Sequence, residues 1–297
     1  ACLLGIVTRP IGLLATFWPA NALMVGMMLR FPKCRSPIAI ASGALAFMAA
    51  DLLTGATFQK TVLLNGANLA SIAATFLFMH RLPSQILLMK EQRSILYLLL
   101  GALVGGIVGG LGGMIANPVI FGGTAMDGWK FWCVTELVNY IMVLPLVLAL
   151  PIPISFDDWM FASFKKKILP VLALIVACVA GSRVGGPGAV MFVVPALIWC
   201  GLSYSVFVTA IIVNVVGYWI LSQLVAIYME TSAQGPDSWS VVSYRLGVSM
   251  LLLTAVMQAV MGASTRSVMD SLRTDANLDF LTKIANRRSF LRLAERI

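Results

Sequence analysis

The chain has 297 residues, of which 60% are hydrophobic and only 11% are charged. Soluble domains carry about 25% charged residues, so this composition excludes an ordinary soluble protein and indicates a membrane protein. The formal net charge is +9, but the basic residues fall mainly in short loops between apolar runs. We therefore attribute them to membrane topology and expect no nucleic-acid partner.

Ten apolar runs are candidates for membrane-spanning helices, which need about 20 apolar residues each. In chain order they are Ala1–Val7, Leu13–Leu29, Pro37–Thr54, Thr61–Met79, Ser94–Ala116, Trp129–Leu150, Ile168–Ser182, Ala189–Gly201, Ser205–Tyr228 and Val241–Ser264. The chain opens on Ala1 inside a run, so we expect residues to precede it. The eighth run is short, and runs seven to nine can be divided in more than one way. We expect an all-α, polytopic bundle of eight to ten transmembrane helices.

The basic residues predict how this bundle is oriented. If the tenth run ends in the cytoplasm, the cytoplasmic loops hold Arg30, Lys33, Arg35, Arg81, Lys90, Arg93, Lys165, Lys166 and Lys167. The opposite side then holds only Arg9, Lys60, Lys130 and Arg183. This excess obeys the positive-inside rule. The pattern predicts a multi-pass protein with a cytoplasmic C-terminus and the lipid bilayer as its first partner.

The fifth run carries a face of small residues. Gly101, Gly105 and Gly109 are spaced four apart, and Gly106, Gly110 and Gly113 continue the pattern. Such faces let helix backbones approach closely. We favour close packing within one subunit; a dimer interface and a mobile gate are the alternatives.

Polar side chains recur inside the apolar runs, where an ionisable group at mid-helix costs about 2.5 to 3.5 kcal/mol. Because of this cost, such groups face the bundle interior and find partners. Our candidates for a signal-binding cavity open to the outside are Trp18, Asn21, Asp51, Asn65, Asn68, Glu136, Asn139 and Arg183. The alternative is that these groups only join helices to one another.

The composition gives little support for a metal or cofactor site. The single histidine is His80, beside Arg81 at a helix end, and the five cysteines stand far apart in sequence. An axial haem ligand is the less favoured role for His80. We predict no metal site and no cofactor in this chain.

The tenth run has no sequence signal that ends it. No Gly or Pro occurs between Ala263 and Ile297, so the helix can continue past the membrane. From Val241 to Leu278 it would measure about 57 Å. Residues 266–278 are the predicted linker helix between the membrane region, residues 1–265, and the segment that follows.

The stretch DFLTKIANRRSF resembles the start of GGDEF domains, which typically read D-x-L-T-x-[LI]-x-N-R-R-x-F. The matching positions are Asp279, Leu281, Thr282, Ile284, Asn286, Arg287, Arg288 and Phe290, while Lys283 stands where Gly is usual. We interpret residues 279–297 as the truncated start of an α/β GGDEF domain.

The membrane region resembles the membrane-associated sensor domain called MASE type one. The similar stretches are TFWPANALMVGMMLR, NGANLASIAATFLF, KFWCVTELVNYIMVLPLVL and VPALIWCGLSYS. Together they cover most of residues 1–265, which we interpret as a transmembrane sensor domain.

The resemblance implies a function. GGDEF domains are diguanylate cyclases, which condense two GTP into cyclic di-GMP with Mg²⁺ or Mn²⁺ across a homodimer. We expect the regulatory region of such an enzyme in the bacterial inner membrane, responding to a small ligand, a lipid or a membrane partner. Its catalytic residues and metal ligands would lie beyond Ile297, so none is assigned here.

Two other classes of protein remain as alternatives. A permease or channel for a small polar solute would be expected to show an inverted repeat, and none is apparent. A sensor kinase would show a histidine in the cytoplasmic helix, and residues 266–297 have none.

Overall fold

The computed structural model describes residues 17–152, 164–231 and 238–277, together with residues 282, 284 and 286. Over these residues the chain is almost entirely helical and has no strand. The α-helices are α2 (Ala20–Arg30), α3 (Pro37–Leu53), α4 (Phe58–Met79), α5 (Ser84–Leu87), α6 (Arg93–Ala116), α7 (Ala125–Leu148), α9 (Phe164–Val184), α10 (Val194–Ser203), α11 (Val206–Thr231) and α12 (Ser238–Asn277). The turns η1 (Pro32–Arg35) and η3 (Pro187–Val193) are 3₁₀-helical, and η2 (Asn117–Phe121) is π-helical.

Within the described ranges, five helices are long and apolar enough to cross a membrane. They are Phe58–Met79, Arg93–Phe121, Ala125–Leu148, Val206–Gln223 and Trp239–Met269. Pro37–Leu53, Ile168–Val184 and Gly188–Ser203 are apolar but shorter. The helical membrane class is thus confirmed, whereas a total of eight to ten spans stays a prediction.

The second predicted run begins later than expected. We predicted a helix from Leu13, but α2 begins at Ala20, with Pro19 at its N-cap and Trp18 in the non-helical segment before it. Proline favours the start of a helix because it lacks a backbone N–H and its φ is already set. Residues before 17, including the first predicted run, lie outside the described residues.

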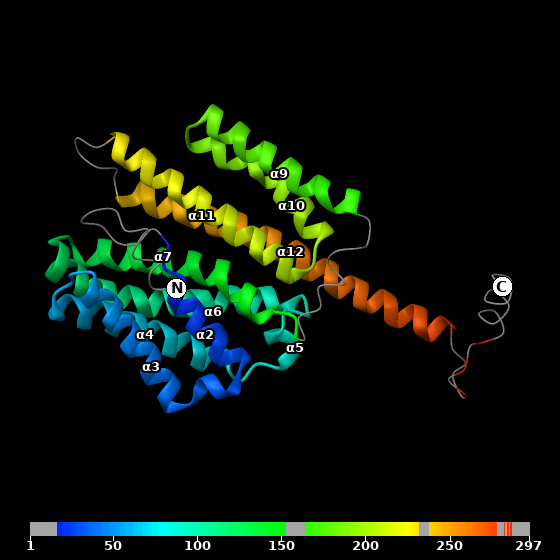
Figure 1. The fold of residues 1–297 in the computed structure, drawn as a ribbon, viewed down its shortest axis with the longest axis horizontal. Helices are drawn as coiled ribbons and strands as arrows, with labels where there is room; N and C mark the ends of the chain where they lie inside the picture. The colour runs from blue at the N-terminus through cyan, green and yellow to red at the C-terminus, as the bar shows by residue number, and fades with distance from the viewer. Residues whose placement is uncertain are drawn as a thin grey trace.

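The helices form two groups that meet along α7 (Figure 1). In the first group α4 packs on α2, α3 and α6, and α6 packs on α7. In the second group α12 packs on α10 and α11, and α9 packs on α10. Helix α7 contacts members of both groups, α2 and α6 on one side and α11 and α12 on the other. Most of its side chains are therefore buried.

The glycine face of α6 packs inside the subunit. Gly101, Gly105, Gly106, Gly109, Gly110 and Gly113 are all buried. A Cβ at Gly106 would lie 2.7 Å from the carbonyl oxygen of Cys133 on α7, and one at Gly101 would lie 2.7 Å from the sulfur of Met79 on α4. The α6 backbone thus approaches both neighbours closely, which confirms the favoured interpretation of this face.

The loops predicted to be cytoplasmic lie at one end of the bundle. Arg30, at the end of α2, donates from Nη2 to the carbonyl oxygen of Leu150 after α7, over 2.8 Å. The guanidinium of Arg35 lies 5.8 Å from the ring centroid of Phe76, near the end of α4. Sequence and structure thus agree that Arg30 and Arg35 lie at the same end as the residues after α7 and the end of α4. Which side of the membrane this end faces stays a prediction.

Helix α12 is a single helix of 40 residues, about 60 Å long at 1.5 Å per residue. Its buried side chains extend as far as Val260, whereas Val268, Met269 and Leu272 are exposed. Figure 1 shows this last part projecting beyond the other helices. The predicted continuation of the tenth run as a helix is therefore confirmed, and its role as a signalling linker stays a prediction.

Candidate functional site

A cluster of hydrogen-bonded polar side chains joins α2, α4 and α7. Asn21 donates from Nδ2 to Asn68 Oδ1 over 3.0 Å and to Glu136 Oε1 over 2.8 Å. Trp18 donates from its indole nitrogen to Asn21 Oδ1 and from its backbone nitrogen to Asn139 Oδ1, each over 3.2 Å. We call Trp18, Asn21, Asn68, Glu136 and Asn139 the polar cluster.

Helical spacing and one glycine build this cluster. Glu136 and Asn139 are three residues apart on α7 and therefore project from the same face. A Cβ at Gly109 of α6 would lie 3.1 Å from Cγ of Glu136. The missing side chain at that position thus leaves room for the carboxylate between α6 and α7.

The polar cluster is shielded from solvent but not fully paired. Glu136 is 3% exposed, Asn139 1% and Asn21 0%. Glu136 Oε2 and Asn139 Nδ2 make no hydrogen bond of good geometry among the residues that the structure describes, although the Ser71 hydroxyl lies close to the Glu136 carboxyl group. Buried polar atoms without partners cost free energy, so these two atoms offer an acceptor and a donor to a small polar molecule. A role in binding a signal stays a prediction.

Asp51 and Asn65 form a separate pair beside the polar cluster. Asn65 donates from Nδ2 to Asp51 Oδ2 and to the carbonyl oxygen of Thr61, each over 2.9 Å. Both residues are buried and connect α3 to α4. Phe47, one turn before Asp51, packs edge-on against the Trp18 ring at 6.3 Å, so the pair adjoins the cluster through α3.

The structure does not bring Arg183 to these residues. It is exposed near the end of α9, and α9 packs against η3 and α10, whereas the polar cluster lies among α2, α4 and α7. Our grouping of Arg183 with the cluster rested on predicted membrane depth. The depth of a residue gives its position along the membrane normal, but it does not determine which helices lie beside it.

We did not predict one buried side-chain contact that lies next to the polar cluster. Arg245 of α12, 4% exposed, donates from Nη1 to Thr135 Oγ1 over 2.9 Å. Its guanidinium lies 4.8 Å from the ring centroid of Phe131, a cation–π distance. An arginine inside the apolar run Val241–Ser264 is a signal that could have found it, because such a charge requires a partner.

The GGDEF-like stretch contacts the end of α12 where it is described. Asn286 donates from its backbone nitrogen to the carbonyl oxygen of Asn277 over 2.9 Å and from Nδ2 to that of Ala276 over 2.8 Å. These bonds satisfy two carbonyl groups that a helix C-terminus leaves open. Asp279, Leu281, Arg287 and Arg288 of the same motif lie outside the described residues.

Across residues 17–152, 164–231 and 238–277, no three His, Cys, Asp or Glu side chains lie close enough together to hold a metal ion. The polar cluster contains one carboxyl group, three amides and one indole, a set suited to a polar organic molecule. Among its five residues no nucleophile is paired with a base.

Comparison with known proteins relates this chain to cyclases. No family model and no solved structure matches it. It is 27% identical over 290 residues to a probable diguanylate cyclase, DgcF, of Escherichia coli O157:H7, covering 96% of this chain and 60% of that protein. It is also 29% identical over 158 residues to the probable diguanylate cyclase DgcF of Escherichia coli strain K12, covering 52% of this chain and 49% of the relative. The chain thus spans between half and three fifths of these relatives, and it is a helical membrane protein similar to probable diguanylate cyclases.

Proposed function

We propose that this chain is the membrane-embedded sensory and regulatory region of a bacterial diguanylate cyclase, which makes cyclic di-GMP from two GTP. The observation that carries the proposal is the course of α12. This one helix packs inside the bundle, projects beyond it and ends against Asn286 of the GGDEF-like motif. The similarity to a probable diguanylate cyclase over 96% of the chain supports the same conclusion.

In this proposal three regions have separate tasks. Residues 1–265 form the sensor domain in the inner membrane, residues 266–278 the linker helix and residues 279–297 the start of the cyclase domain. The exposed apolar residues Val268, Met269 and Leu272 of α12 give two copies of the linker a surface on which to pair. Such a homodimer would bring two GTP-binding domains face to face at the cytoplasmic side.

Signal transfer in the proposal starts at the polar cluster. A small polar ligand that bonds to Glu136 Oε2 and Asn139 Nδ2 favours the arrangement of α2, α4 and α7 in which both atoms are reachable. A ligand can shift a conformational equilibrium only through such a difference in binding. Because Thr135 adjoins Glu136 and accepts a hydrogen bond from Arg245, a movement of α7 reaches α12 directly.

The chemistry of nucleotide cyclisation is not assigned to any residue of this chain. Mg²⁺ or Mn²⁺ bound with GTP in a cyclase domain polarises the phosphate and activates the attacking hydroxyl. The residues described here hold helices, position the linker and offer a polar site. Their contribution is to set how often two cyclase domains meet in a productive geometry.

The test is cyclic di-GMP formation by the full-length protein reconstituted in lipid nanodiscs with GTP and Mg²⁺ or Mn²⁺. We expect product from the wild type and a changed rate for Glu136→Gln and Asn68→Ala, each measured below the melting temperature of the variant. Absence of product with either metal would remove the cyclase proposal. An unchanged rate of cyclic di-GMP formation in both variants would show that the polar cluster does not regulate the enzyme, and the cyclase proposal would stand.

A further inference from the structure

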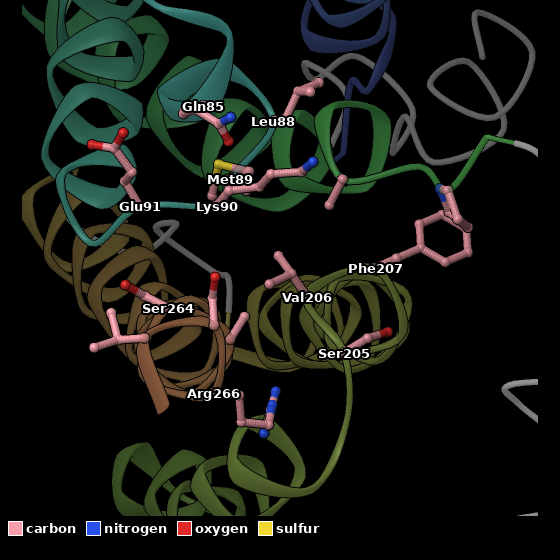
Figure 2. Close-up of a pocket in the computed structure, with 15 residues that line it drawn as sticks. Gln85, Leu88, Met89, Lys90, Glu91, Ser205, Val206, Phe207, Ser264 and Arg266 are labelled. Atoms are coloured by element: carbon pink, nitrogen blue, oxygen red, sulfur yellow. The ribbon is translucent and has the colours of Figure 1, made fainter. Parts of the chain in front are cut away.

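A cavity of about 840 Å³ lies where α12 leaves the bundle (Figure 2). Four parts of the chain line it: the connection between α4 and α6 from Gln85 to Glu91, the residues after α7, the start of α11, and α12 between Ala263 and Val268. The residues after α7 are Ala149 and Pro151. Since Glu136 lies 13 residues before Ala149, the cavity is about 20 Å from the polar cluster along α7.

The cavity carries a surplus of positive charge. Lys90 and Arg266 line it from opposite walls (Figure 2). The carboxylate among the lining residues, Glu91, is already paired, because Arg93 lies 2.9 Å from it in an ion pair. The lining thus includes two cations and one carboxylate, and that carboxylate is already paired. This charge distribution favours an anion.

The start of α11 adds hydrogen-bond donors to the same cavity. Ser205, Val206 and Phe207 all line it, and the Ser205 hydroxyl accepts from the backbone nitrogen of Val208 over 3.4 Å. The first turn of a helix leaves backbone N–H groups unbonded and carries partial positive charge. Ser264 and Ser267 of α12 supply two further hydroxyl groups. Phosphate oxygens, which only accept hydrogen bonds, match this set of donors.

Apolar side chains complete the walls. Leu88, Met89, Val206 and Val268 lie beside the cations and serines, so the cavity suits a molecule with both a charged and an apolar part. Met89 has a φ of 58°, in the left-handed region that non-glycine residues seldom adopt. It is buried, at 2% exposed, and the next residue is Lys90. Packing thus holds a strained turn at the point where the chain presents a lysine to the cavity.

We propose that this cavity binds a phosphate-bearing anion. Two sources share that chemistry: the headgroup of an anionic phospholipid, and a soluble phosphate compound such as pyrophosphate or a nucleotide. An anion bound between the Gln85–Glu91 wall and the α12 wall would tie the exit of α12 to the connection between α4 and α6. The effect of this link on cyclase activity depends on the proposed function, whereas the binding of the anion does not.

The experiment measures melting of this chain in detergent after removal of lipid, followed by fluorescence of its seven tryptophans. The probes are short-chain phosphatidylglycerol, short-chain phosphatidylcholine and inorganic pyrophosphate. A ligand that binds only the folded state raises the melting temperature. For a lipid ligand we expect a rise with phosphatidylglycerol and none with the other two. For a soluble ligand we expect the rise with pyrophosphate.

Matched variants assign the rise to the cavity. Lys90→Ala combined with Arg266→Ala should abolish it. Lys33→Ala with Arg81→Ala removes the same charge from residues that are equally exposed but lie outside the cavity, and it should preserve the rise. If the first pair fails to fold, Ser267→Asp adds a negative charge to the wall and should abolish the rise instead. Lys90→Arg with Arg266→Lys should retain it.

The proposal is overturned if no probe raises the melting temperature, or if the cavity variants and the exposed control lose the rise equally. Binding is measured on this chain without any cyclase reaction. Failure of the anion site therefore leaves the proposed function intact, and absence of cyclase activity leaves a measured anion site intact.

Discussion

Arg245 of α12 donates a hydrogen bond over 2.9 Å to Thr135 of α7, the residue immediately before Glu136 of the polar cluster. The helix that projects from the bundle is therefore held at the turn of α7 that carries the buried carboxylate. Arg245 is also fixed by its stacking over Phe131. A change in the position of Glu136 consequently acts on α12 through a direct side-chain contact.

The Arg245–Thr135 contact predicts energetic coupling between α12 and α7. Arg245→Met keeps the apolar stem and removes the donor, and Thr135→Val removes the acceptor. Each should destabilise the protein by about 1 to 3 kcal/mol, because the remaining buried group loses a partner. Together they should show an interaction energy of about 1 kcal/mol or more. Unfolding of the two single variants and the double variant in detergent measures this energy.

Arg183→Met supplies the control for that cycle, since Arg183 is exposed on α9. Its effect should add to that of Thr135→Val within about 0.5 kcal/mol. If the unfolding free energies of Arg245→Met and Thr135→Val were also additive, the contact between α7 and α12 would contribute no stability.

The polar cluster predicts a second coupling, between α2 and α4. Asn21 bonds to Asn68, whereas Asn65, three residues earlier on α4, bonds to Asp51. Asn21→Ala with Asn68→Ala should therefore deviate from additivity by about 0.5 kcal/mol or more. Asn21→Ala with Asn65→Ala should be additive. Equal coupling in both pairs, measured by denaturant unfolding, would contradict the hydrogen-bond assignment.

Close packing of α6 predicts that a single methyl group on its buried face is destabilising. Gly106→Ala would place Cβ 2.7 Å from the backbone oxygen of Cys133, whereas nothing lies within 4 Å of a Cβ at Gly66 on α4. A backbone oxygen cannot rotate away, so Gly106→Ala should cost about 1 to 3 kcal/mol. Gly66→Ala, the matched control, should be neutral or slightly stabilising. Equal melting temperatures for the two variants would show that α6 can move away from α7 at little cost.

The contact between Asn286 and the end of α12 predicts local fraying when it is lost. Asn286→Asp keeps the shape of the side chain but replaces the donor to Ala276 with a carboxylate. A negative charge at a helix C-terminus is also unfavourable, by about 0.3 to 1 kcal/mol. Amide hydrogen exchange in residues 274–277 should become faster, while Ile284→Ala, at an exposed position, should leave it unchanged. Equal amide exchange rates in the two variants would show that Asn286 does not cap α12.

Much of this architecture could be predicted because it follows from local pattern. Apolar length predicted the helices, four-residue spacing predicted the packed face of α6, and the absence of Gly and Pro after Ala263 predicted the length of α12. The grouping of Trp18, Asn21, Asn68, Glu136 and Asn139 could also be expected, since polar groups in hydrocarbon seek one another.

The rest depended on which helices are neighbours, and no local pattern contains that information. Arg183 was expected beside Glu136 and lies on α9 instead, while Arg245 was overlooked and lies beside Thr135. The cavity at the exit of α12 was equally invisible in the sequence, because residues from four separated segments build it. Tertiary packing determines the neighbours of Arg183 and Arg245 and forms the cavity.

The most direct test of signal transfer through α12 combines two changes in the full-length protein. Glu136→Gln replaces the buried carboxyl group with an amide, and two glycines inserted after Ser271 interrupt the helix between the bundle and the GGDEF-like motif. Cyclic di-GMP formation is measured for the wild type, each single change and both together. If α12 transmits the state of the polar cluster as a rigid helix, Glu136→Gln changes the rate in the uninterrupted protein and has no effect once the glycines are present. An equal effect of Glu136→Gln with and without the insertion would contradict that mechanism.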